Sequence, residues 1–171
     1  FQKRIFTPVS LLRNLADVAG VLPSTPTLFT SGRVSPAFRE RLFLTVTSVN
    51  KCRYCAWMHT DIAQAEGVSD EQIHALLDGA PGTGLDDEKP ALLYALHFAQ
   101  TNRNPGAGQT AELKRIYGEE KAADIFAFLQ FFFVNKRIVN AVYVDTPKEA
   151  VINERSALIV LKTQRLKKVH V

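Results

Sequence analysis

The sequence contains only two cysteines in 171 residues, Cys52 and Cys55. Two thiols are too few for a small domain that is held together by several disulfides. Apolar runs are also short, because the richest one, at residues 126–134, falls well below the roughly 18 residues that a transmembrane helix needs. The sequence shows no secretory signal pattern, which favours a cytoplasmic protein. A close cysteine pair in such a reducing compartment indicates catalysis, redox sensing or metal binding.

Positive charge is in small excess, with a formal net charge of +4, and it gathers near the C-terminus. Nucleic-acid binding would require basic residues interleaved with aromatics or a recognisable binding module, and no aromatic residue follows Tyr143. We therefore expect no nucleic-acid partner. The chain is divided into a domain at residues 1–150 and a basic C-terminal extension at residues 151–171, which is solvated or contacts another subunit. The basic residues of the extension are Arg155, Lys162, Arg165, Lys167 and Lys168, and Lys148 lies just before it.

Helical periodicity recurs along the chain and predicts one all-α domain. Ser35-Pro36 is typical of an N-cap followed by proline at the first helical position. The helix after it is apolar nearly all round at residues 42–46 and is expected to be buried. A stretch rich in Pro, Ser and Thr precedes it at residues 23–35, and residues 157–161 are compatible with a strand or a helical turn. Helices are expected after Ser10, Ser35, Asn50, Ser69 and Asp87, then a short one closed by Gly118 and a long one at residues 119–144.

The residues that carry chemistry lie close together at positions 52–59. On a helix, Cys52, Cys55 and His59 fall within roughly a quarter of the circumference, so two thiols and an imidazole share one face. The i, i+3 spacing permits a disulfide across one turn, and the i, i+4 spacing brings His59 beside Cys55. If Asn50 caps this helix, Cys52 lies in the first turn, where the helix dipole favours an anion. Such surroundings lower a thiol pKa from about 8.5 to roughly 3.5–7.5.

The cysteine pair has three other interpretations. A structural zinc site needs four ligands, and His74, His97 and His170 do not complete one at any usual spacing, so no metal is expected. A thioredoxin-like motif would follow a strand in a βαβ unit, whereas the neighbouring segments have helical patterns. Two inert buried cysteines beside a core histidine are the third alternative. The pattern favours a redox-active dithiol on a helix.

Glu40 is a candidate partner for this face. It lies in the buried helix that precedes the cysteines, where a polar side chain is costly to bury without a partner. If the two helices pack antiparallel across the short turn at residues 49–51, Glu40 and His59 can meet. A carboxylate paired with an imidazole beside a thiol forms a plausible proton relay. The alternative is a surface glutamate paired with Arg39 or Arg41.

The set of Glu40, Cys52-x-x-Cys55 and His59 resembles the signature of the alkyl hydroperoxidase D (AhpD) and carboxymuconolactone decarboxylase family. Residues 44–50, 67–71 and 135–137 resemble the family as well, and the resemblance covers roughly residues 10–144. It implies an AhpD-like all-α fold, homo-oligomers built as trimers or hexamers, and thiol-dependent peroxidase activity. It also implies that the glutamate and the histidine serve a proton relay while the cysteines cycle between dithiol and disulfide.

The expected function is therefore a thiol-dependent alkyl hydroperoxidase or disulfide reductase with catalytic residues Glu40, Cys52, Cys55 and His59. No cofactor, metal or membrane is expected. The substrate would be a peroxide or a small disulfide, and an external dithiol or redox protein would act as reductant. The helix terminus favours Cys52 as the attacking thiol and His59 favours Cys55, so this point stays open. The alternatives are a non-enzymatic redox sensor or assembly protein, and a lyase that acts on a lactone acid.

One residue departs from the pattern of AhpD. AhpD carries a second histidine between its cysteines, at the position of Tyr54 here. Tyrosine is a poor base near neutral pH, so the full relay is not carried over, and the physiological peroxide and reductant stay open. The decarboxylase branch generally lacks the cysteine pair, which puts this sequence on the peroxidase-like side.

Overall fold

The computed structural model describes residues 25–83 and 85–142, together with the isolated residues 9, 12, 16, 19 and 20. Every regular element within this part of the chain is helical, which confirms the predicted all-α fold. Most of the helix expected after Ser10 (all but residues 12, 16, 19 and 20), residues 143–144 of the last helix, and the extension at residues 151–171 lie outside the described residues. The elements are α2 (Thr25–Thr30), α3 (Pro36–Asn50), α4 (Arg53–Ala65), α5 (Asp70–Leu77), η2 (Pro81–Thr83), α6 (Lys89–Gln100) and α7 (Ala107–Val142).

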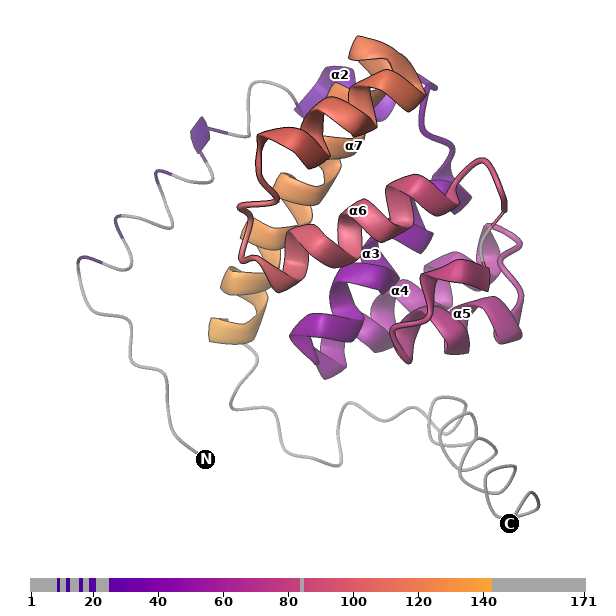
Figure 1. Cartoon of the computed structure of the whole chain (residues 1–171). Helices are drawn as coiled ribbons and strands as arrows, with labels where there is room; N and C mark the ends of the chain where they lie inside the picture. The colour runs from indigo at the N-terminus through magenta and orange to yellow at the C-terminus, as the bar shows by residue number, and fades with distance from the viewer. Residues whose placement is uncertain are drawn as a thin grey trace.

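The central element is α3, which packs against α4, α5, α6 and α7 (Figure 1). It begins as predicted: the Ser35 hydroxyl accepts a hydrogen bond from the backbone N–H of Phe38 at 3.2 Å, and Pro36 is the first helical residue. Because neighbours cover it on several sides, every residue from Glu40 to Thr47 is buried. The expectation of a buried helix is confirmed.

The turn between α3 and α4 differs from the prediction. Asn50 is the last residue of α3, and Lys51 adopts a left-handed conformation (φ 49°, ψ 37°) that ends the helix. The N-cap of α4 is Cys52, whose sulfur accepts a hydrogen bond from the backbone N–H of Cys55 at 3.3 Å. The predicted cap at Asn50 was wrong because α3 extends through Asn50. Cys52 therefore lies one position outside the first turn of α4.

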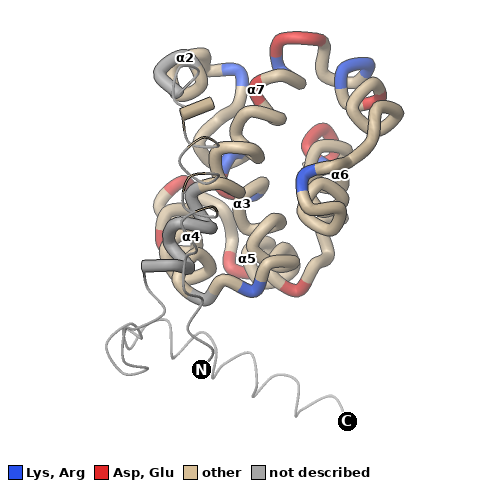
Figure 2. The backbone as a smooth tube through the Cα atoms, turned by 90° about the vertical axis from the view of Figure 1, so that its left-hand side faces the viewer, with Lys and Arg blue, Asp and Glu red and all other residues tan. Residues whose placement is uncertain are grey.

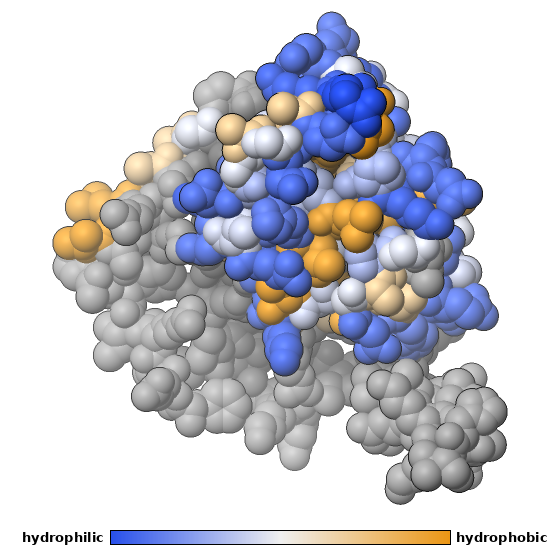
Figure 3. All heavy atoms as spheres, viewed as in Figure 1, coloured by the Kyte–Doolittle hydropathy of each residue, from blue (hydrophilic) through white to orange (hydrophobic). Residues whose placement is uncertain are grey.

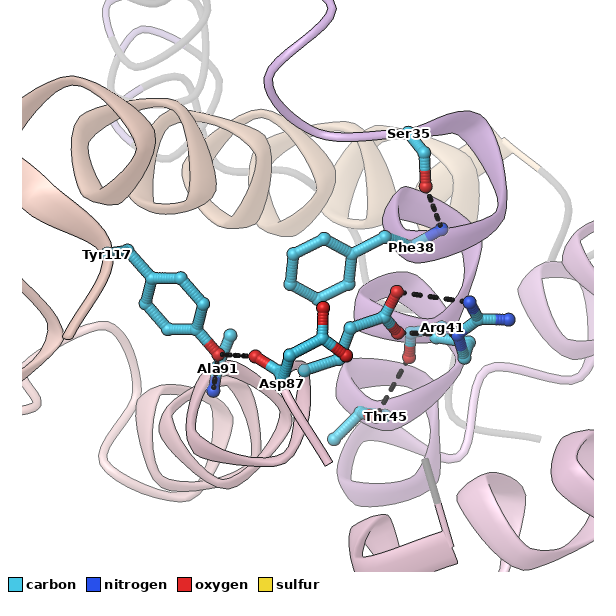
Figure 4. A network of polar contacts seen from close by, with 8 residues as sticks. Ser35, Phe38, Arg41, Thr45, Asp87, Ala91 and Tyr117 are labelled. Atoms are coloured by element: carbon cyan, nitrogen blue, oxygen red, sulfur yellow. Dashed lines mark hydrogen bonds and ion pairs between the residues drawn. The ribbon is translucent and has the colours of Figure 1, made fainter. Parts of the chain in front are cut away.

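The start of α6 also differs by one residue. The cap is Glu88 rather than the predicted Asp87, and its side chain makes no capping hydrogen bond. Its carboxylate instead binds the buried guanidinium of Arg41 on α3, with Nε–Oε2 and Nη2–Oε1 distances of 2.6 and 3.1 Å. Tyr117 fixes the same region by donating to the carbonyl of Asp87 and accepting from the N–H of Ala91 (Figure 4). Burial raises the pKa of Tyr117, which keeps the phenol a donor.

Two predicted boundaries are confirmed. Ser69 caps α5 through a hydrogen bond from the backbone N–H of Gln72 at 3.3 Å. Gly118 interrupts α7 with φ 77° and ψ 166°, so the element consists of a short helix and a long one on either side of the glycine. This backbone region is essentially open to glycine alone.

The helix α2 was not predicted, because it lies in the stretch rich in Pro, Ser and Thr. A proline is tolerated in the first turn of a helix, so Pro26 does not prevent it. The segment is held by tertiary contacts: the ring of Phe29 packs edge-on against Phe128 and Phe131 of α7, with centroids 5.4 and 5.7 Å apart. Arg33, just after α2, binds Asp124 of α7 at 2.6 Å. These tertiary contacts stabilise a helix in a segment whose residues have a weak intrinsic preference for helical structure.

Both signs of charge are scattered over the described helices rather than gathered on one face (Figure 2). Apolar side chains reach the surface over α6, where Leu93 is 54% exposed (Figure 3). Within residues 25–83 and 85–142, none of the helices combines the length and the apolar character that crossing a membrane requires.

The Gly118→Ala variant tests the backbone constraint between the two halves of α7. Apart from atoms of neighbouring residues in the chain, no atom of the described structure lies within 4 Å of a Cβ built at Gly118, so the strain comes from the backbone conformation. We expect it to lower the free energy of unfolding by about 1–3 kcal/mol in urea denaturation. Gly108→Ala, in the first turn of α7, is the matched control and should be neutral or stabilising. An equal effect of the two substitutions would contradict this view of Gly118.

Candidate active site

Glu40 of α3 and His59 of α4 meet in the interior of the protein. The Oε2 atom of Glu40 lies 2.6 Å from Nδ1 of His59, and the two residues are only 2% and 5% exposed. This contact confirms the prediction that α3 and α4 form an antiparallel hairpin across a short turn. A hydrogen bond between two buried polar groups is strengthened by its low-dielectric surroundings, so it fixes the orientation of the imidazole.

Aromatic rings enclose the imidazole. The ring of Phe43 on α3 and the ring of Phe132 on α7 both contact His59 edge-on, with centroid distances of 5.1 and 4.9 Å. The two phenyl rings stack on each other at 4.6 Å. The stacked rings come from two different helices and together form one apolar wall against the imidazole of His59.

The second carboxylate oxygen of Glu40 accepts a hydrogen bond from Nε of Arg39 at 3.2 Å. The alternative interpretation placed Glu40 at the surface, paired with Arg39 or Arg41. The contact with Arg39 is present, but Glu40 is buried and not at the surface. Arg41 turns away to bind Glu88. Glu40 shares its carboxylate between an imidazole and a guanidinium and is buried while doing so.

Cys52 and Cys55 form a disulfide across the beginning of α4. The disulfide that the i, i+3 spacing permits is therefore present in the structure. Both cysteines are buried, with 4% and 2% exposure, and His59 follows Cys55 by one helical turn on the same face. The four residues singled out from the sequence are thus all buried on one helical hairpin.

Tyr54, at the position of the second histidine of AhpD, lies on a different side of α4 from Cys55. It lies about 100° around α4 from Cys55, and its half-buried ring packs against that of Trp57, with centroids 5.7 Å apart.

Several residues of the site were not identified from the sequence. Phe132 is distant in the chain, and nothing local marks it as a neighbour of His59. Thr47 and Asn50 follow Glu40 on α3 at i+7 and i+10, so helical register alone would have placed them on the face of α3 that carries Glu40. Among the described residues, no three His, Cys, Asp or Glu side chains are grouped so that they would hold a metal ion.

The model of the carboxymuconolactone decarboxylase family matches residues 26–101 of the chain. No curated protein and no solved structure matches the chain. The matched segment extends from α2 through α6 and contains Glu40, both cysteines and His59. The family resemblance stated from the sequence motif is therefore confirmed for this segment.

A double-mutant cycle tests the energetic link between Glu40 and His59. Glu40→Ala leaves the buried imidazole without its partner and should lower the free energy of unfolding by about 1–3 kcal/mol. His59→Ala removes the other partner, so the double variant should lose less than the sum of the single variants, with a coupling of at least about 0.5 kcal/mol. Glu66→Ala at the exposed end of α4 is the control and should change stability by less than about 0.5 kcal/mol. Strict additivity in urea denaturation would argue against the pair.

Proposed function

We propose that this carboxymuconolactone decarboxylase-family segment is the catalytic unit of a thiol-dependent peroxidase. The observation that carries the proposal is the position of a dithiol that closes to a disulfide, one helical turn from a buried imidazole held by a carboxylate. Thiol, base and orienting group in this order form the arrangement that activates a nucleophile in general. The family includes both AhpD-like and decarboxylase-like proteins, and the cysteine pair favours the first.

In the proposed cycle, one cysteine thiolate attacks the terminal oxygen of a hydroperoxide. A sulfur–oxygen bond forms, the oxygen–oxygen bond breaks, and the alkoxide takes up a proton and leaves as an alcohol, while the sulfur becomes a sulfenic acid. The second thiol attacks this sulfur, so that a disulfide forms and water leaves. An external dithiol or redox protein then supplies two electrons and two protons by thiol–disulfide exchange.

His59 and Glu40 supply the proton transfers of this cycle. Since Glu40 holds Nδ1, proton exchange with the sulfur and with the departing oxygen passes through Nε2. Glu40 orients the ring and stabilises the imidazolium that forms when the thiol gives up its proton. The apolar wall of Phe43 and Phe132 strengthens this charge pairing by keeping water away from it.

The same chemistry supports reduction of a small disulfide, because thiol–disulfide exchange runs in both directions. The expected homo-oligomer also stays a prediction that follows from the family resemblance.

A lyase is the second candidate function, because decarboxylases give the matched family its name. Lyase activity would not use the thiols, so it should survive their alkylation, whereas peroxide turnover should not.

Peroxide consumption with a panel of dithiols and redox proteins tests the proposal. The wild-type protein should turn over repeatedly, and Cys52→Ser, Cys55→Ser and alkylated wild-type protein should not. Loss of a general base typically lowers the rate by about 10²–10⁴-fold, and we expect this for His59→Gln.

The control for the histidine variant is His74→Gln, on α5 and outside the site, which should retain wild-type turnover. Wild-type turnover in both cysteine variants would exclude the peroxidase. Stoichiometric oxidation without turnover, whatever the reductant, would support a redox sensor instead.

A further inference from the structure

Three side-chain polar atoms in the described part of the chain are buried without a hydrogen-bond partner, two of them on α3 (Thr47 and Asn50) and one on α4 (Nε1 of Trp57). Oγ1 of Thr47 and Nδ2 of Asn50 are inaccessible to solvent and make no hydrogen bond within the described part of the chain. The whole of Thr47 is only 2% exposed. Its neighbours behave differently, because Thr45 donates to the carbonyl of Arg41 at 2.8 Å and Ser48 donates to that of Thr45 at 2.7 Å.

An unpaired buried donor is unfavourable and uncommon in native proteins. Thr47 lies in the last turn of α3, where a backbone carbonyl one turn earlier is normally within reach of the hydroxyl. Valine would fill the same volume without the polar atom. The hydroxyl of Thr47 is therefore understandable if an acceptor is present in another state of the protein.

Helical register places both donors on the face of α3 that meets α4. Glu40, Phe43, Thr47 and Asn50 fall within about 80° of arc on α3. The first two contact His59 directly. Thr47 and Asn50 continue this face toward the turn that leads to Cys52.

The positions of Thr47 and Asn50 along the hairpin indicate which cysteine sulfur these two donors approach. Thr47 follows Glu40 by seven residues, and His59 follows Cys52 by seven residues. Because the helices are antiparallel, the step from Glu40 to Thr47 and the step from His59 back to Cys52 both lead about 10 Å toward the turn. With Glu40 at the level of His59, Thr47 lies at the level of Cys52. Asn50 is only two residues from Cys52 in the chain.

We propose that the Thr47 hydroxyl and the Asn50 amide donate hydrogen bonds to the thiolate of Cys52 when the disulfide is reduced. A disulfide sulfur is a weak acceptor, which agrees with the unpaired donors in this oxidised structure. Reduction by an external dithiol breaks the S–S bond, oxidises that dithiol to its own disulfide and leaves two thiols. When the Cys52 thiol releases its proton, the resulting anion is buried and requires donors.

The backbone already contributes one donor to this sulfur. The N–H of Cys55 lies 3.3 Å from Sγ of Cys52, at the N-terminus of α4, where the helix dipole also favours negative charge. With Thr47 and Asn50, three donors would converge on Cys52 from two helices. This gives Cys52 the role of the stable thiolate and leaves Cys55 as the thiol beside His59.

The charged groups around Cys52 are left in place by the variants below. Lys51 is exposed in the turn before it. The guanidinium of Arg41 forms an ion pair with Glu88. In the described part of the chain, the buried ionisable side chains other than cysteine and tyrosine are Glu40 and Arg41 on α3, His59 on α4, Glu88 at the start of α6 and Asp124 on α7.

A protein with Cys52 as its only thiol tests the proposal directly. In the Cys55→Ser background, the thiolate of Cys52 is followed by its ultraviolet absorbance and its alkylation rate as the pH is varied. Adding Thr47→Val removes one hydrogen bond to a charged group and should raise the pKa of Cys52 by about one to two units. Asn50→Ala should raise it as well, and Thr47→Ser should restore the original value.

Thr45→Val is the matched control, because Thr45 is equally buried on the same helix but its hydroxyl is already bonded to a carbonyl. It should leave the pKa of Cys52 unchanged. The proposal is overturned if Thr47→Val and Asn50→Ala both leave this pKa where it is in the Cys55→Ser background, or if Thr45→Val changes it as much.

Two further readouts use the protein with both cysteines. At a pH above the pKa of Cys52, Thr47→Val should shift the equilibrium with dithiothreitol about tenfold toward the protein disulfide. The oxidised Thr47→Val protein should be no less stable than wild type, since it loses only an unpaired hydroxyl. An unchanged equilibrium, or a clear loss of stability in the oxidised state, would contradict the proposal.

The inference rests on the proposed dithiol cycle, but none of its tests uses a peroxide. A wild-type protein that shows no peroxide turnover, together with a shifted equilibrium in Thr47→Val, would remove the peroxidase and retain the thiolate contacts. Peroxide turnover by the wild-type protein, together with an unchanged dithiothreitol equilibrium in Thr47→Val, would retain the peroxidase and remove the thiolate contacts.

Discussion

The buried hydrogen bond between Glu40 and His59 is the interaction on which the rest of the site depends. It joins α3 to α4 far from the turn that connects them, so it determines the register of the hairpin. The register in turn sets which residues of α3 lie at the level of the cysteines. On another side of α3, the ion pair of Arg41 with Glu88 ties the helix to the start of α6. The central helix is thereby held from two directions by buried polar contacts, in which loss of one partner is strongly unfavourable.

The redox-active bond in this site is confined to one end of a single helix. The disulfide spans one turn at the start of α4, and the sulfur of Cys52 also caps that helix. Opening the disulfide leaves two thiols beside an imidazole at one end and beside unpaired donors at the other. The oxidised protein buries polar groups that have no partner, while the reduced protein would give them one. Functional sites commonly carry such local costs, which the surrounding packing tolerates.

Much of the hairpin was predictable because its signals are local. The Ser35-Pro36 cap, the apolar centre of α3 and the helical spacing from Cys52 to His59 all depend on neighbouring residues. The meeting of Glu40 with His59 followed from two helices and a short turn. What could not be predicted depends on distant segments: α2 is held by rings of α7, and Phe132 reaches His59 from the same helix. The caps at Asn50 and Asp87 were each misplaced, in one case because α3 continues through Asn50 and in the other because Glu88 ends the turn and binds Arg41.

The account stands on rapid, reversible oxidation of the cysteine pair by a hydroperoxide. The protein has one tryptophan, Trp57, which lies on α4 between the cysteines and His59, so its fluorescence should report closure of the disulfide. The most direct measurement mixes fully reduced protein with one equivalent of hydroperoxide in a stopped-flow instrument and identifies the product by mass spectrometry. The account predicts a second-order rate constant far above that of free cysteine and the Cys52–Cys55 disulfide as product. Oxidation no faster than that of free cysteine would contradict it.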